Sequence, residues 1–193
     1  MSGESINLTN QFLIAMPGMA DERFAGTVVY LCEHNDRGAL GLVINKPIDI
    51  SLTRLFDKVD LHLGRDDLQD SPVYFGGPVQ TERGFVLHER IGTEESPYHS
   101  TLAIPGAQVE MTTSRDVLEA LSSGAGPRRV LVTLGYCGWG AGQLEDEIGR
   151  NGWLTVQAEP SVIFDTPVDQ RYGKALSLLG IDPRMLSQEA GHA

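Results

Sequence analysis

Short apolar runs, each closed by glycine, proline or a polar turn, dominate the first half of the chain and constrain its fold more than any other feature. The runs at 12–15, 27–32 and 39–44 are rich in β-branched, aromatic and other apolar residues, which is typical of strands. Because the apolar positions are consecutive, they indicate a sheet that is covered on both faces. The turn residues at 34–38 predict a β-hairpin between the second and third runs.

Further strands and several helices follow without a regular alternation. Runs at 73–75 and 84–88 flank Gly76, Gly77 and Pro78 and predict a second strand–turn–strand unit. We expect the remaining strands at 129–134 and 153–156, and helices at 51–56, 114–121 (with Ser114 as N-cap), 143–148 and 168–179 (with Gly180 just beyond its end).

This mixture of elements predicts an α+β fold. No linker is long enough to divide the chain, so we expect a single domain over residues 1–193. Its core is expected at about 7–183, followed by a polar tail at 184–193.

Composition excludes several classes of protein. The chain carries 15 Lys and Arg against 26 Asp and Glu, a net charge of −11 that opposes non-specific attraction to nucleic acid or to an anionic membrane. Two cysteines are too few for a disulfide-dense scaffold or a zinc site of four thiolates. No segment approaches the ~20 apolar residues of a membrane span, and the amino end lacks a secretory signal. We therefore expect a cytoplasmic protein without a membrane partner.

The stretch at 134–147 is the most unusual part of the sequence, because its glycines lead from a predicted strand into a predicted helix. A glycine loop at Gly135, Gly138, Gly140 and Gly142 could present backbone amides to a phosphate. The spacing matches neither the P-loop nor the dinucleotide-binding pattern, and the acidic residues at 145–147 would repel a phosphate. We therefore expect these glycines to shape the backbone, with phosphate binding as the alternative.

Several separated blocks occur in a recognisable order along the chain, at 12–17, 30–34, 38–47, 75–79, 87–88 and 134–147. Together they resemble the AlgH/YqgE family of small bacterial proteins, from about residue 12 to the last predicted helix. The resemblance implies an α+β fold in which a bent mixed or antiparallel sheet forms an incomplete barrel with flanking helices. It also implies a cytosolic bacterial protein of a kind described as a transcriptional regulator, and it supplies no catalytic residues.

Glycine-rich segments that meet at one edge of a sheet often leave a cleft between them. On this ground we predict a ligand or interaction pocket lined by Gly76, Gly77, Trp139 and Gly140.

Cys137 is the candidate redox thiol. It lies among glycines just ahead of a predicted helix, and a helix start lowers the pKa of a nearby thiol. Cys32 lies in an apolar run beside Glu33, whose charge disfavours a thiolate. Most cysteines in such surroundings are small buried apolar residues, and this is the alternative for both.

His34 and His88 each end a predicted strand, where they could form a metal or acid–base site with neighbouring carboxylates. Zinc-peptidase and serine-hydrolase motifs are absent, so we expect histidines that bond backbone groups, with no metal, cofactor or catalytic residue. Arg128 and Arg129 are the only adjacent basic pair, so direct DNA binding is not expected.

These observations favour a binding or regulatory module that recognises an unknown protein or small-molecule partner, in preference to an enzyme. The alternative function is a thiol-based redox sensor or small-ligand enzyme that uses Cys137 and the glycine loop. The two differ in the pKa and the exposure of that thiol.

Overall fold

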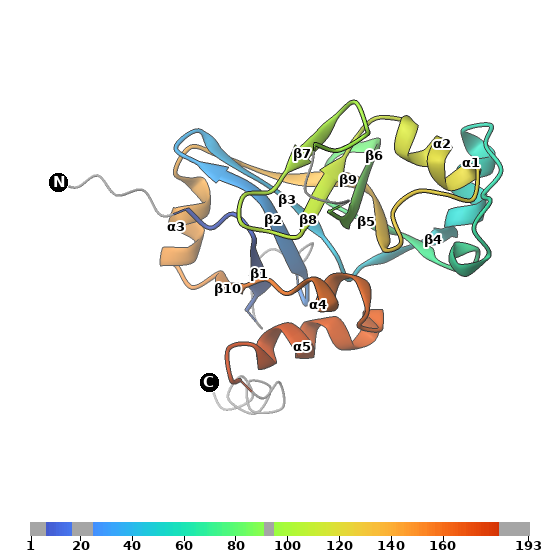
Figure 1. The fold of residues 1–193 in the computed structure, drawn as a ribbon. Coiled ribbons are helices and arrows are strands. Elements are labelled where there is room, and N and C mark those ends of the chain that lie inside the picture. The colour runs from blue at the N-terminus through green and yellow to red at the C-terminus, as the bar shows by residue number, and fades with distance from the viewer. Residues whose placement is uncertain (1–6, 17–24, 91–94, 182–193) are drawn as a thin grey trace.

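The computed structural model, which describes residues 7–16, 25–90 and 95–181, forms one curled ten-stranded sheet with short helices around it (Figure 1). The strands are β1 (Gln11–Ala15), β2 (Val28–Asn35), β3 (Gly38–Val43), β4 (Pro47–Ser51), β5 (Pro72–Phe75), β6 (Val79–Glu89), β7 (Thr101–Ala103), β8 (Val109–Thr112), β9 (Val130–Gly140) and β10 (Trp153–Gln157). The helices are α1 (Leu52–Lys58), η2 (Asp66–Leu68), α2 (Asp116–Ser122), α3 (Gln143–Gly149), α4 (Pro160–Phe164), η3 (Val168–Gln170) and α5 (Arg171–Ser177), of which η2 and η3 are 3-10 helices.

Strand β9 joins the two halves of the sheet. The order along the main path is β10-β1-β2-β3-β9-β6-β8-β7, and every pair on this path is antiparallel. One end of β9 pairs with β3, and the other pairs with β6 and, in parallel, with β5, which carries β4. The predicted α+β class, a single domain with a curled half-barrel sheet, is confirmed.

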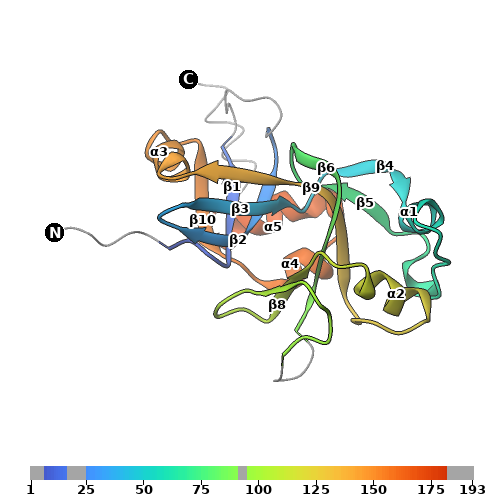
Figure 2. The same cartoon turned by 90° about the horizontal axis from the view of Figure 1, so that it is seen from above.

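Both faces of the sheet are buried, as the consecutive apolar positions predict. Along β1, Phe12 and Ile14 enter one core, whereas Leu13 and Ala15 enter another. The first core is packed against α4 and α5, the second against α3, and a third core lies under α1 and α2. Figures 1 and 2 agree that α1 and α2 lie at one end of the molecule and α3 at the opposite end.

The elements with local signals are confirmed. Strands β2 and β3 form the predicted hairpin, in which Asn35 pairs with Gly38. Helix α1 begins after Ser51, whose hydroxyl accepts a hydrogen bond from the Arg54 amide as an N-cap. Gly180 takes a left-handed φ of +77° just beyond the C-terminal helical segment, as predicted.

Three predictions were wrong, and in each case contacts distant in sequence decide the structure. Strands β5 and β6 are not neighbours, because β9 lies between them and pairs with both. The glycine stretch is not a loop, because β9 continues through it to Gly140 and pairs there with β3. Helix α2 begins after Arg115 and not after Ser114, whose hydroxyl donates to Asp116.

The carboxyl-terminal helix is also more segmented than the sequence indicates, since a 3-10 turn (η3) precedes α5. The predicted polar tail at 184–193 lies outside the described residues. Within the described ranges, no helix is both long and apolar enough to cross a membrane.

Candidate functional site

The glycines of β9 let two backbone segments pass in close contact. Gly135 has a left-handed φ of +81°, and a Cβ built there would lie 2.3 Å from the Gly77 carbonyl oxygen. A Cβ at Gly76 would lie 2.3 Å from the Gly135 oxygen, and one at Gly77 would lie 2.1 Å from the Tyr136 carbonyl carbon. Only glycines fit this crossing, which agrees with a structural role for the stretch.

The residues of the predicted pocket lie along the same strand but have different surroundings. Gly76 and Gly77 pack on the β9 backbone at 135–137, so the space beside their Cα atoms is filled. Trp139 and Gly140 pair with β3 further along, and the Trp139 side chain is buried in the second core. Because the space beside Gly76 and Gly77 is filled, a pocket bounded by all four residues would have to open near Gly140. The predicted pocket stays a prediction.

A carboxylate fastens the glycine strand to the helix that follows it. Glu147 Oε1 accepts hydrogen bonds from the indole Nε1 atoms of Trp139 (3.0 Å) and Trp153 (2.9 Å). Its Oε2 accepts from Gln143 Nε2 at 3.1 Å, and Gln143 Oε1 accepts from the Gly140 amide at 3.0 Å. This role of Glu147 was not predicted from the sequence, where it belongs to the acidic run at 145–147.

We expect Glu147→Ala to lower the free energy of unfolding by about 2 kcal/mol, because it removes a charged acceptor from two largely buried indoles. The chain has two tryptophans and both bond Glu147, so their emission should shift to longer wavelength as water reaches the site. Glu147→Gln keeps an acceptor oxygen and should lose less than half as much. Equal losses in urea unfolding, or unchanged emission, would contradict this role.

Both thiols lie inside the protein. The side chains of Cys32 and Cys137 are each 1% exposed. Burial raises the pKa of Cys137 to about 12. Burial also raises the pKa of Cys32, and the nearby Cys137 and Glu33 raise it further. A thiol whose pKa is raised and which water cannot reach lacks the two properties of a reactive cysteine.

The two histidines have separate partners. His34 Nδ1 accepts a hydrogen bond from the Leu8 amide at 3.0 Å, and its Nε2 lies 3.3 Å from Glu145 Oε1. His88 lies on β6, with Nδ1 3.0 Å from the Glu89 carbonyl oxygen. Among the residues that the structure describes, no group of three or more His, Cys, Asp or Glu side chains could hold a metal ion.

His88 belongs to a buried polar network whose protons can be assigned. A carbonyl only accepts, so Nδ1 carries the proton that is donated to Glu89. Nε2 is then an acceptor for the Thr112 hydroxyl at 2.7 Å, and Thr101 Oγ1 lies 2.8 Å from the same hydroxyl. Burial lowers the pKa of His88, although the nearby Glu110 acts in the opposite direction.

This lowered pKa predicts an acid-sensitive step in stability. Below about pH 6.5 the unfolded chain binds more protons at His88 than the folded chain does, so the free energy of unfolding falls as the pH falls. We expect His88→Gln to flatten that decline between pH 7 and pH 5 in denaturant titrations. His99→Gln, at a side chain that is 90% exposed, is the control. Parallel curves for His88→Gln and the unchanged protein would refute the assignment.

A cleft of about 230 Å³ lies between α1, β6 and α2, and we call it the α1–α2 cleft. Its walls are largely apolar, and polar residues lie around them. Its apolar wall consists of Leu55, Val59, Gly84, Val86, Leu118, Val132 and Leu134, and the polar residues are Glu82, Arg83, Thr112, Thr113, Ser114 and Arg115.

Arg115 ties the two helices together beside this cleft. Its Nη2 donates a 2.7 Å hydrogen bond to the Val59 carbonyl oxygen at the end of α1, and its Nε lies 3.9 Å from Glu119 Oε2 on α2. Thr112, whose hydroxyl belongs to the His88 network, also lines the cleft. Sequence reasoning missed this cleft. Gly84, the first residue of the strand predicted at 84–88, lies in the interior of the longer β6, where a glycine often marks a close approach to the backbone.

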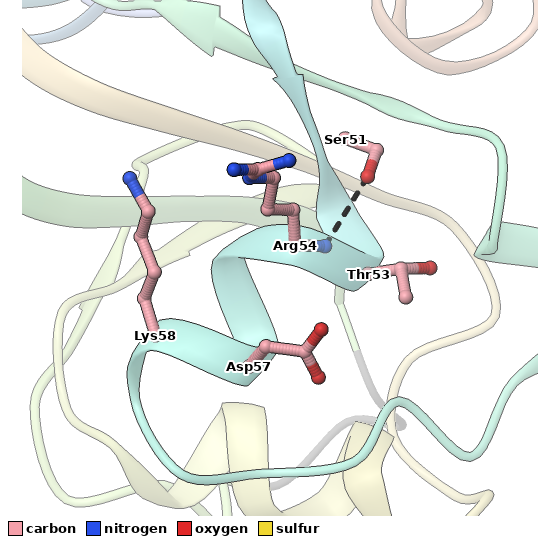
Figure 3. A pocket seen from close by; sticks show the side chains of 5 residues that line it. All are labelled: Ser51, Thr53, Arg54, Asp57 and Lys58. Carbon is pink, nitrogen blue, oxygen red and sulfur yellow. Dashed lines mark hydrogen bonds between the residues drawn. The ribbon is translucent and has the colours of Figure 1, made fainter.

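A more open polar depression of about 550 Å³ lies beside α1 and is lined by Ser51, Thr53, Arg54, Asp57 and Lys58. Figure 3 shows Arg54 and Lys58 extending from the same side of the helix, while Asp57 points away from them. Arg54 and Lys58 directly precede Leu55 and Val59 of the α1–α2 cleft.

Comparison with known proteins gives consistent matches along the chain. The model of the AlgH-like family matches residues 12–184. A UPF0301 protein of Ralstonia nicotianae is 68% identical over 188 residues, covering 97% of this chain and 96% of that protein. A UPF0301 protein of a Polaromonas species is 69% identical over 189 residues, with the same coverage.

Two solved structures are also similar. The solution structure of the AlgH protein from Pseudomonas aeruginosa has a TM-score of 0.78 and 46% identity, and the match covers 100% of both chains. The crystal structure of a protein from Corynebacterium diphtheriae has a TM-score of 0.68 and 20% identity, over 90% of this chain and 87% of that one, which is a likeness of fold.

Proposed function

The chain belongs to the AlgH-like family, and on that premise we propose that it is a ligand-binding module with a regulatory role in the bacterial cytoplasm. The observation that carries the proposal is the α1–α2 cleft, where a largely apolar wall is combined with polar residues. Sites for small ligands usually combine these two features. The cleft is smaller than the ~300–1,000 Å³ of drug-sized sites, which favours a small ligand or a single side chain of a partner.

The state of the thiols favours binding over redox chemistry. Cys137 is buried in the second core, its Sγ lies 3.5 Å from the Gly76 carbonyl oxygen, and burial raises the pKa of this thiol to about 12. The thiol sensor is therefore the second candidate function. It would require β9 to leave this packing before any oxidant reached the sulfur.

Regulation through a bound ligand also fits the charge distribution better than direct reading of DNA. Arg129, one half of the adjacent basic pair, is 3.0 Å from Asp165 Oδ2. Helix α2 carries Asp116 and Glu119 in its first turn, and the chain has a net charge of −11. Such a surface repels phosphates at low salt, where DNA-binding proteins associate best.

The cleft can be closed by one substitution. A Cβ at Gly84 meets nothing within 4 Å, so the side chain of Gly84→Leu would occupy the cleft without disturbing the backbone. We expect a thermal-shift screen with metabolites to find compounds that stabilise the unchanged protein but not Gly84→Leu. Gly149→Ala, at the end of α3 and equally free of neighbours, should respond like the unchanged protein. Compounds that stabilise all three equally would count against the cleft.

Thiol labelling tests the second candidate. We expect a thiol reagent to leave both cysteines of the folded protein unmodified at pH 8 and to label two per chain in denaturant. Rapid labelling of Cys137 in the folded protein, abolished in Cys137→Ala but not in Cys32→Ala, would favour the redox sensor.

A further inference from the structure

Gly84 has no evident structural reason to be a glycine. It lies in β6 without a left-handed φ, and a Cβ built on it would have no neighbour within 4 Å. By contrast, Gly76, Gly77 and Gly135 are required by direct contact with the backbone of another segment. A glycine inside a strand weakens it and often marks a place where a ligand approaches closely. At position 84 the missing side chain leaves open space in the wall of the α1–α2 cleft.

The two residues before Gly84 connect this cleft with a second, polar depression, which we call the β6 depression. It has a volume of about 490 Å³ and is lined by Gln80, Thr81, Glu82 and Arg83. Glu82 and Arg83 also line the α1–α2 cleft, so the cleft and the β6 depression adjoin along the strand. An apolar wall and two opposite charges therefore belong to one continuous site.

Strand β6 is irregular where these two charges lie. Its pairing with β9 shifts register between Val79 and Gly84, and Gln80 has a left-handed φ of +48°. Left-handed backbone is uncommon for residues other than glycine, and strained residues of this kind cluster at sites that hold ligands. Consecutive side chains of a regular strand point to opposite faces, whereas a bulge redirects them. The irregularity thus accounts for Glu82 and Arg83 both lining the cleft and the β6 depression.

Within the part of the chain that the structure describes, Glu82 and Arg83 have no ionic partner. Neither side chain has an oppositely charged group within 4 Å, and they do not pair with each other. Arg83 Nη1 donates a long hydrogen bond of 3.4 Å to Gln80 Oε1, and its guanidinium lies 5.7 Å from the centre of the Phe85 ring. Arg115, the other cation of the cleft, is already engaged between α1 and α2. One carboxylate and one guanidinium are therefore available to a ligand that carries both charges.

We propose that this site binds a free aliphatic α-amino acid of about the size of leucine. At pH 7 such a ligand carries an ammonium and a carboxylate on the same carbon, so it can meet the consecutive residues Glu82 and Arg83 together. Its aliphatic side chain packs on Val86, Leu118 and Val132. The cleft of about 230 Å³ suits one such side chain, because sites for drug-sized ligands measure ~300–1,000 Å³. This inference rests on the proposed function and adds the chemical class of the ligand.

Analogues that each lack one feature of L-leucine test the assignment. In amide NMR spectra of the full chain, L-leucine should shift the signals of Gly84 and Leu118. It should bind at least about tenfold more tightly than 4-methylpentanoate, which lacks the ammonium, or 3-methylbutylamine, which lacks the carboxylate. It should exceed L-serine, which lacks the aliphatic side chain, by a similar factor.

Variants of the two charged residues should act on different probes. Glu82→Gln should weaken binding of L-leucine about tenfold without weakening that of 4-methylpentanoate. Arg83→Gln should weaken binding of L-leucine about tenfold without weakening that of 3-methylbutylamine. Gly84→Leu should abolish the shifts with every probe. Asp36→Asn and Arg37→Gln, at exposed positions of the β2–β3 turn, are the matched controls and should bind like the unchanged protein.

The outcomes distinguish the two proposals. If a singly charged analogue or L-serine binds as tightly as L-leucine and Gly84→Leu abolishes that binding, the assigned ligand class is wrong and the cleft remains a binding site. Losses in Glu82→Gln or Arg83→Gln no larger than those in the controls also overturn the ligand class. If none of the probes shifts the signals of the cleft, the ligand class is likewise overturned, and the metabolite screen decides whether the cleft binds anything. Binding of L-leucine that persists in Gly84→Leu overturns both proposals.

Discussion

Replacing Gly135 by alanine is expected to lower the free energy of unfolding by at least about 4 kcal/mol, which leaves little or no folded protein. The added Cβ would lie 2.3 Å from the Gly77 carbonyl oxygen, a contact with backbone that no rotamer change relieves. Separating the segments would break the pairing of β9 with both β5 and β6. Urea unfolding followed by far-ultraviolet circular dichroism measures the loss.

Gly142→Ala is the matched control, because it separates the clash from the cost of a left-handed residue. Gly142 has a φ of +76°, close to the +81° of Gly135, but a Cβ there meets nothing within 4 Å. Its replacement should therefore cost only the left-handed conformation, about 1 kcal/mol. If Gly135→Ala were no more destabilising than Gly142→Ala, the close crossing of the two glycine segments would be refuted.

The close contact between the two glycine segments also explains why the sequence predicted the β2–β3 hairpin but not the strand conformation of Gly135 to Gly140. The β2–β3 hairpin has a turn between two apolar runs, so a window of about twenty residues contains all the information. Gly135 to Gly140 lacked such a signal, because glycines weaken strand propensity and favour turns. Their strand conformation depends on partners at 38–41 and 74–79, which are distant in the chain.

The α1–α2 cleft was not predicted from the sequence, for a related reason. The glycine-rich segments predicted a pocket at Gly76, Gly77 and Trp139. In the structure, Gly76 and Gly77 contact the backbone of β9 directly. The α1–α2 cleft is assembled from α1, β6, α2 and β9, and no sequence motif marks it. Gly84 lies in the wall of this cleft, and the structure, not the sequence, shows that β6 does not require a glycine there. Whether Gly84 lines a cleft depends on α1 and α2, which pack beside it in the folded protein.

Arg171→Met is expected to lower the free energy of unfolding by about 3 kcal/mol. Arg171 is 7% exposed, and its side chain joins α5 to Ile44 and Tyr74, which are distant in the chain. Its Nη1 donates a 2.5 Å hydrogen bond to the Ile44 carbonyl oxygen, and its Nε donates a 2.9 Å bond to that of Thr166. The guanidinium also lies 5.0 Å from the centre of the Tyr74 ring. Methionine fills much of the same volume but leaves both carbonyls without these donors.

Two variants show whether the donors or the charge matter. Arg171→Lys keeps the charge, but its single ammonium does not reproduce the fork that reaches two carbonyls, so it should recover about half of the loss. Lys174→Met, at an exposed position of the same helix, should change the stability by less than about 0.5 kcal/mol. If Arg171→Lys were as stable as the unchanged protein, charge alone would hold α5 in place. If Arg171→Met were as harmless as Lys174→Met, packing of the apolar face of α5 on the first core would be sufficient, and the buried arginine would have no structural role.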